Sequence, residues 1–237
     1  MGILNILRGG WTSLLDLFYP PLCMQCQSLL NNNEHFLCAD CIQNLPRTEM
    51  AQHRGNRVEQ LFWDISKLQK GAAFCFYRHD EPYRKLIHRI KYNNKPLLGE
   101  YLGEVMAREF LKQHFFDTID FVVPVPLHPK RQRKRGYNQA EYIAKGISNI
   151  TAIPLDTTHL QRVVNNPTQT KKSSAERVRN TQGVFSVKMP ANWRGKHILL
   201  VDDIITTGAT LRACMQVITP IHGTTISVIA LGIADSL

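Results

Sequence analysis

Residues 198–211, ILLVDDIITTGATL, decide the fold of this chain. The four apolar residues at 198–201 form a continuous run, which is typical of a central strand in a parallel sheet that is covered on both faces. Asp202 and Asp203, called the acid pair below, follow at the carboxyl end of that strand, where open α/β sheets bind ligands. The next turn is rich in threonine and opens a helix, so hydroxyls and free backbone N–H groups attract a phosphate there.

The acid pair suits a partner of the opposite kind. Ribose hydroxyls donate hydrogen bonds to carboxylates, and Mg²⁺ prefers hard oxygen ligands. An ordinary capped helix does not need two acids, three threonines and a glycine within nine residues. A receiver domain also carries paired acids, but it needs further strands with an acceptor aspartate and a lysine, and Asp235 is the sole acid after Asp203. Neither the Walker pattern nor the dinucleotide fingerprint occurs.

The net charge of +10, from 29 basic and 19 acidic residues, predicts a polyanionic partner, either nucleic acid or a phosphorylated ligand. Five of the six residues at 130–135 are basic, and they follow an apolar strand at 119–127. A solvated loop is the usual explanation of such a run. Because the neighbouring strand should carry the acid pair, we expect this loop to lie over a pyrophosphate or along a nucleic-acid backbone, through Lys130, Arg131 and Arg135.

Four cysteines form two pairs with metal-ligand spacing: Cys23, Cys26, Cys38 and Cys41. Two such pairs let four thiolates converge on a tetrahedral Zn²⁺ in a segment too small for its own core. Two disulfides are the alternative, but the apolar residues 1–23 match neither a signal peptide nor a membrane span. We therefore expect a cytoplasmic protein in which a structural zinc is favoured over disulfides.

The chain divides into three predicted parts: an amphipathic helix and four-cysteine module at 1–45, a polar linker at 46–70 and the main domain at 71–237. The apolar positions of the first helix recur at helical spacing: Leu4, Leu7, Trp11, Leu14, Leu15 and Phe18. In the main domain we expect strands near 71–77, 183–188 and 225–231, and helices near 81–92, 97–115 and 137–149. The polar residues 165–180 have the composition of a surface loop or of a lid that closes over a ligand.

The 198–211 stretch resembles the phosphoribosyl pyrophosphate (PRPP) motif of type I phosphoribosyltransferases. The resemblance implies that the acid pair contacts the ribose hydroxyls. It also implies that the turn holds the 5′-phosphate, through Thr206, Thr207, Gly208, Ala209 and Thr210. The order of the cysteine module, VPVPLH at 123–128, RGYNQ at 135–139 and the PRPP motif extends the resemblance to the ComF (competence protein F) family over essentially the whole chain.

The family resemblance implies an α/β fold of the type I phosphoribosyltransferase kind, a mainly parallel sheet flanked by helices, with a small zinc module. It also implies a role in natural transformation, where single-stranded DNA is handled beside a helicase or recombination mediator.

Two functions of different class remain open. One is transfer of a phosphoribosyl group from PRPP with Mg²⁺, with Asp202, Asp203, Lys130 and Arg131 as catalytic residues. The other is binding of single-stranded DNA, with the basic run on the backbone and Tyr137 available for stacking. We favour a role in DNA uptake with a PRPP-type pocket.

Overall fold

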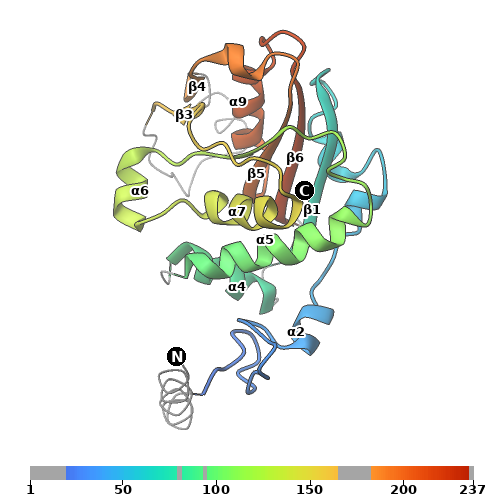
Figure 1. Cartoon of the computed structure of the whole chain (residues 1–237), viewed down its shortest axis with the longest axis vertical. Coiled ribbons are helices and arrows are strands. Elements are labelled where there is room, and N and C mark those ends of the chain that lie inside the picture. The colour runs from blue at the N-terminus through green and yellow to red at the C-terminus, as the bar shows by residue number, and fades with distance from the viewer. Residues whose placement is uncertain (1–19, 79–81, 93–94, 165–182, 235–237) are drawn as a thin grey trace, which may run out of the picture. The chain divides into compact units, whose positions relative to one another are not determined.

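The computed structural model describes residues 20–78, 82–92, 95–164 and 183–234 (Figure 1). The predicted N-terminal helix and the predicted lid at 165–180 lie outside these residues. The chain splits into two compact units, Met1–Leu45 and Pro46–Leu237. Each unit is described by itself below.

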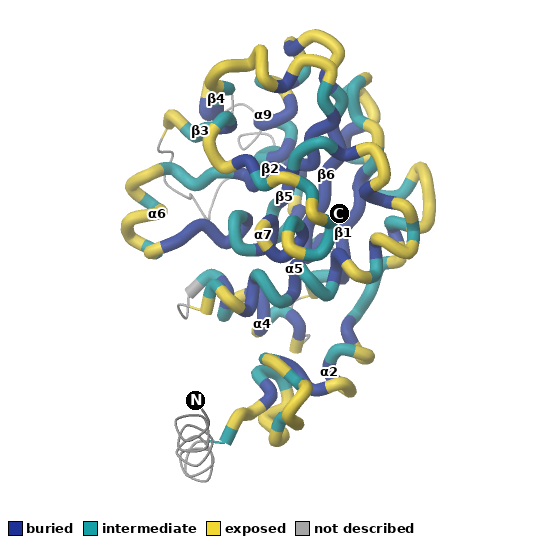
Figure 2. The backbone as a smooth tube through the Cα atoms, in the orientation of Figure 1, coloured by how far each residue is buried: buried dark blue, intermediate teal, exposed yellow. Residues whose placement is uncertain are grey.

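The second unit is built on a parallel sheet with the strand order β1-β6-β5-β2. Its strands are β1 (Leu68–Tyr77), β2 (Phe121–Pro124), β5 (His197–Ile205) and β6 (Thr225–Ala234). The apolar run 198–201 lies in β5, between β2 and β6, and its four residues are fully buried. Figure 2 shows buried residues gathered along β5 and β6. The prediction of a central parallel strand is confirmed.

Helices cover both faces of this sheet, as expected from the rule that parallel crossovers are right-handed. The main helices are α4 (Pro82–Tyr92), α5 (Pro96–Leu111), α7 (Gln139–Thr151) and α9 (Ala209–Ile218). From β1 the chain crosses the sheet to β2. It then continues in the same direction to Leu155, which forms a parallel bridge with Val122 of β2. The crossover from β5 to β6 runs in the other direction, so α5 and α7 share one face and α9 covers the opposite face. Helices α5 and α7 pack along each other, and α7 packs on β2 and β5 (Figure 1).

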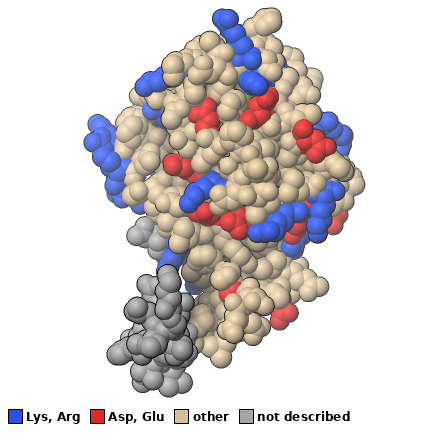
Figure 3. Space-filling model, in the orientation of Figure 1, with Lys and Arg blue, Asp and Glu red and all other residues tan. Residues whose placement is uncertain are grey.

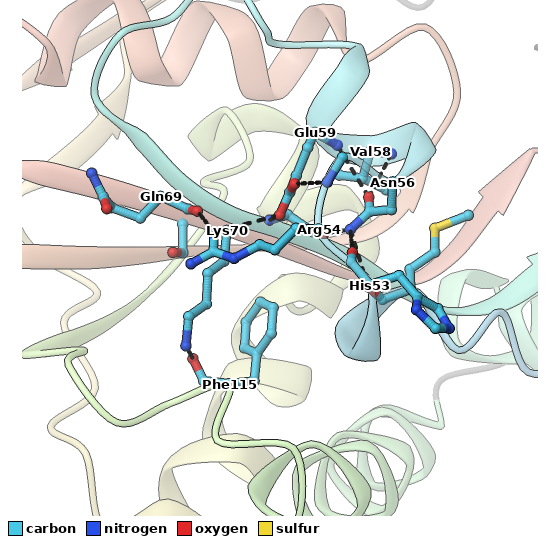
Figure 4. Close-up of polar contacts among 12 residues, drawn as sticks. His53, Arg54, Asn56, Val58, Glu59, Gln69, Lys70 and Phe115 are labelled. Atoms are coloured by element: carbon cyan, nitrogen blue, oxygen red, sulfur yellow. Dashed lines mark hydrogen bonds and ion pairs between the residues drawn. The ribbon is translucent and has the colours of Figure 1, made fainter.

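Residues 46–70, where the sequence predicts a linker, pack on β1 as part of the second unit. They contain two short helices, η1 (Met50–Gln52) and α3 (Arg57–Gln60). The side chain of Asn56 caps α3 by accepting from two backbone N–H groups, and its Nδ2 donates to the carbonyl of Gly71 in β1 at 2.7 Å (Figure 4 shows the cap). Val58 and Phe62 are fully buried. The segment is polar overall, so its composition predicts a linker although these few residues are buried.

The basic run 130–135 is a helix, so the prediction of a loop is wrong there. Helix α6 (Pro129–Arg135) begins with proline at its first turn, a position that proline favours. His128 precedes it, and its Nδ1 accepts from the backbone N–H of Lys130 at 3.2 Å. Gly136, with φ of 89°, ends it in the left-handed region. These end signals are strong enough to form two turns of helix despite the repulsion among its charges.

The remaining elements are short. Strands β3 (Leu160–Arg162) and β4 (Phe185–Val187) pair antiparallel, and η2 (Pro190–Trp193) precedes β5. The first unit contains one helix in its described part, α2 (Ala39–Gln43). Within the described ranges, every helix is too short or too polar to cross a bilayer.

Candidate ligand-binding site

The acid pair lies in β5 itself, which continues to Ile205 beyond the apolar run. Both carboxylates are half-buried, and the backbone N–H of Asp203 donates to Asp202 Oδ1 at 2.8 Å. Because successive side chains of a strand point to opposite faces, Asp203 turns toward α4 and α7, and the hydrogen bond from its N–H fixes the Asp202 carboxylate on the other face at the carboxyl end of the sheet.

The phosphate turn, residues 206–210, follows directly and leads into α9. Gly208 precedes the helix with φ of 71°, and no side chain caps the first N–H groups. A Cβ atom at Gly208 would lie 2.7 Å from Phe62 Cζ, so both the backbone conformation and the close approach require glycine. The turn therefore combines uncapped N–H donors with the positive end of a helix dipole, which is an arrangement that attracts a phosphate.

Two further residues contact Asp203, and neither was among the predicted site residues. Lys91 Nζ lies 3.1 Å from Asp203 Oδ2, and Gln139 Nε2 donates to the same oxygen at 3.3 Å. Gln139 belongs to the motif at 135–139, which is a signal that could have identified it. Lys91 comes from the last turn of α4, and only the tertiary fold brings it to β5.

Burial dominates the electrostatics of the acid pair. It raises the pKa of Asp202 to about 7, and the charge of Asp203 acts in the same direction. The hydrogen bond from Asp203 and the charges of Lys91 and Arg162 oppose this rise. Asp202 is therefore poised to change its charge near neutral pH.

We expect Asp202→Asn to stabilise the protein in a pH-dependent way. The folded-state pKa lies above the unfolded value of about 4, so the stability linked to the neutral carboxyl is complete below pH 4 and is lost as the pH rises through 7. Asparagine stays neutral, so thermal unfolding should show the variant a few degrees above wild type at pH 8 and much closer to it at pH 5.

Asp120→Asn is the control for this pH series. Burial opposes ionisation of Asp120, but the backbone N–H of His197 and the Lys196 ammonium lower its pKa below the ordinary value. It is ionised at both pH 5 and pH 8, so its effect on stability should be equal at the two values. A pH-independent effect of Asp202→Asn would contradict the raised pKa.

The basic helix α6 presents most of its charge to solvent, and Figure 3 shows Lys and Arg gathered where Figure 1 places it. Lys130 is exposed and, within the described residues, forms no ion pair with the acid pair; Arg131 and Arg135 are half-buried. Arg162 links the two regions electrostatically. Its pKa is lowered first by burial and then by the charge of Arg131, while Asp202 opposes the shift.

Tyr137 does not lie on this surface, so its predicted availability for stacking is wrong. Its side chain is 6% exposed, and its hydroxyl donates to the carbonyl of Ile90. Its ring packs edge-on against Tyr142 at 5.8 Å between centroids. The residue joins α4 to α7 inside the core.

The four cysteines of the first unit converge, as their spacing predicts. The Sγ atoms of Cys23, Cys26, Cys38 and Cys41 all lie within 4.8 Å of one another, and none of the four forms a disulfide. Tetrahedral zinc with Zn–S bonds of about 2.3 Å needs sulfurs roughly 4 Å apart, so the cluster fits a zinc module. The backbone N–H groups of Gln25 and Cys38 donate to Cys23 Sγ at 3.5 and 3.4 Å, a further stabilisation of a thiolate.

The Ser28 hydroxyl lies 2.9 Å from Cys26 Sγ. It is the main cause of the lowered pKa of Cys26, which falls to about 6. A thiolate is thereby favoured at the exposed member of the cluster, and thiolate is the form that binds metal.

The family model and the relatives that match this chain agree with one another. The model of the phosphoribosyl transferase domain matches residues 104–231, which is more than half of the chain. Competence protein F of Haemophilus influenzae is 30% identical over 210 residues, covering 82% of this chain and 89% of that protein. DNA utilization protein YhgH of Escherichia coli is 26% identical over 200 residues, covering 83% of this chain and 77% of that protein.

Among solved structures, glutamine phosphoribosylpyrophosphate amidotransferase from B. subtilis, complexed with ADP and GMP, is 21% identical with a TM-score of 0.40. The match covers 60% of this chain and 30% of that one. The matched domain contains the acid pair, the phosphate turn and Gln139, while α4 with Lys91 precedes it. The chain thus belongs to the competence protein F family, whose members carry a phosphoribosyltransferase domain.

Proposed function

We propose that this protein handles single-stranded DNA during DNA uptake in the cytoplasm and holds PRPP or another phosphorylated ribose in a separate pocket. The observation that carries the proposal is the acid pair and phosphate turn at the end of β5, in a chain whose relatives are named competence and DNA utilization proteins. The acid pair and the phosphate turn point to a ribose phosphate, and the names of the relatives point to DNA.

In the pocket, the acid pair accepts hydrogen bonds from the ribose hydroxyls, and the phosphate turn binds the 5′-phosphate through Thr206, Thr207, Gly208, Ala209 and Thr210. The oxygen-rich site also fits Mg²⁺, which PRPP would bring on its pyrophosphate. In the first unit, zinc bound by Cys23, Cys26, Cys38 and Cys41 is structural, because four cysteines fill its coordination sphere.

The basic helix α6 follows the DNA backbone, with contributions from Lys130, Arg131 and Arg135. Its exposed charge and the net charge of +10 support this role. A helicase or recombination mediator is the partner class that would receive the DNA.

The second candidate function is phosphoribosyl transfer to a nitrogen nucleophile. The bond from C1′ to the pyrophosphate oxygen breaks, a bond from C1′ to nitrogen forms, and pyrophosphate leaves. Asp202 and Asp203 would orient the ribose while Lys130 and Arg131 stabilise the leaving charge. The acid pair and the phosphate turn at the end of β5, which such a transfer needs for the ribose and its 5′-phosphate, favour this candidate.

One experiment tests both ligands of the proposal. The melting temperature of the protein is measured in the presence of PRPP, once with Mg²⁺ and once without it. In parallel, the affinity for a single-stranded oligonucleotide is measured over a series of salt concentrations. We expect PRPP to raise the melting temperature. We also expect the logarithm of DNA affinity to fall by about 0.7 per phosphate contacted for each tenfold rise in salt.

The variant Asp202→Asn/Asp203→Asn should lose the response to PRPP and keep the affinity for DNA. Lys130→Gln/Arg131→Gln should keep the response to PRPP and bind DNA more weakly, with a smaller salt slope. If PRPP gives no shift and DNA binding has no salt slope in wild type, both parts of the proposal fail. Release of pyrophosphate from PRPP when a nucleobase is added as the nitrogen nucleophile would favour the second candidate.

A further inference from the structure

The acid pair lies in an environment unusual for a site that must accept an anion. Two carboxylates repel a phosphate, and a sugar phosphate brings further negative charge to the same place. In this chain one cation contacts the pair, and the charge of a second one acts on it. Lys91 forms an ion pair with Asp203 at 3.1 Å, and the charge of Arg162 acts on Asp202.

Both cations are held in place. The side chains of Lys91 and Asp203 are 23% and 15% exposed, so water screens their attraction only in part. Arg162 donates from Nε to the carbonyl of Val164 at 3.4 Å, and its guanidinium lies 5.4 Å from the centroid of the Phe185 ring. The charge of Asp203 is therefore compensated by Lys91 before any ligand arrives.

A further group at the same carboxylate remains unsatisfied. Gln139 is 4% exposed, and its Nε2 donates to Asp203. Its Oε1 is buried and has no hydrogen-bond partner in the part of the chain that the structure describes. A buried acceptor without a donor is unfavourable, and a hydroxyl of a bound sugar would supply the donor.

We propose that Lys91, with Gln139, completes the sugar-phosphate pocket by neutralising Asp203, so that a ribose phosphate binds here without a divalent cation. Lys91 lies on α4, before the stretch 104–231 that the family model matches. The inference rests on the proposed ribose-phosphate pocket and makes Lys91 a positioning residue.

The test uses ribose 5-phosphate, which has the sugar and the 5′-phosphate but no pyrophosphate to chelate Mg²⁺. Its affinity for the full chain is measured by calorimetry in EDTA and in Mg²⁺. Wild type should bind equally in both. Lys91→Met should bind about tenfold more weakly in EDTA and recover in Mg²⁺, because the ion replaces the lost charge.

Two variants serve as controls. Lys91→Arg keeps the cation and should behave as wild type. Lys145→Met removes a lysine that pairs with Glu100 at 3.1 Å on the helix surface, and it should also leave affinity unchanged. A wild type that needs Mg²⁺, or a Lys91→Met variant that is unaffected or is weakened equally in both buffers, would overturn the inference.

The two proposals fail differently. If wild type binds no ribose 5-phosphate in either buffer, the pocket itself is wrong. If it binds only with Mg²⁺, the pocket stands and the role of Lys91 is wrong. Should Lys91→Met fail to fold, the buffer comparison on wild type and Lys91→Arg still decides the matter.

Discussion

Cys23→Ser should release zinc and unfold the first unit. Cys23 is fully buried, its sulfur accepts two backbone N–H groups, and its three partner sulfurs lie within 4.8 Å. The unit has little else to stabilise it, since its described part contains one helix of five residues. Segments below about 40 residues usually need a metal or disulfides to fold.

The expected loss is large because zinc binding and folding are the same event in such modules. Structural zinc in small modules contributes about 10 to 16 kcal/mol at neutral pH. We expect one zinc per chain in wild type by elemental analysis and none in Cys23→Ser, with loss of dispersed NMR signals from residues 20–45. Chelation of wild type at neutral pH should produce the same spectrum.

Cys214→Ser is the matched control, because Cys214 is a buried free thiol of the second unit. It should keep the zinc, and its melting temperature, measured in the same way, gives the cost of replacing a buried cysteine that binds no metal. Replacement of zinc by Co²⁺ in wild type should give the absorption of a tetrahedral thiolate site. Retention of metal by Cys23→Ser, or two disulfides in the protein purified under reducing conditions, would refute the assignment.

The central strand and the cysteine cluster were predictable because their signals are local. An apolar run of four residues that leads into paired acids and a glycine-containing turn is typical of a strand buried inside a parallel sheet, and paired cysteines at short spacing have few other uses. The structure confirms the buried parallel strand and brings the four sulfurs together.

Other features depended on weaker signals. A run of charges predicts a loop, yet Pro129 and Gly136 supply the end signals of a helix. The buried side chains of Val58 and Phe62 are too few to outweigh the polar residues around them. Tyr137 follows a basic run, which suggested a surface position, but the fold turns its ring inward.

The contact between Lys91 and Asp203 could not be predicted from any local sequence pattern. Helix α4 has two basic residues in its last turn, Arg89 and Lys91, and nothing in its sequence distinguishes the one that meets Asp203. That contact depends on how α4, α5 and α7 pack over the sheet. The packing of α5 on α7 is therefore part of the architecture of the site as well as of the core.

Gly103→Ala should separate α5 from α7 and destabilise the second unit. A Cβ atom at Gly103 would lie 2.3 Å from the carbonyl oxygen of Ile143, and one at Gly146 would lie 2.0 Å from that of Glu100. The obstacles are backbone atoms, which cannot rotate away. Overpacking of this kind costs about 3 kcal/mol, and the better helix propensity of alanine returns about 1 kcal/mol. The melting temperature should fall by roughly 4 to 8 °C.

Gly99→Ala separates this effect from helix propensity, because Gly99 lies one turn earlier in the same helix. Its Cβ would meet side-chain atoms, the nearest being Ile90 Cγ2 at 3.2 Å, and a methyl group can shift by a few tenths of an ångström. We expect its stability to equal or slightly exceed that of wild type in denaturant unfolding. Because α7 carries Gln139 to Asp203, Gly103→Ala should also weaken ribose 5-phosphate binding, whereas Gly99→Ala should not. Equal stability of the two variants would mean that the helices do not approach as closely as their glycines allow.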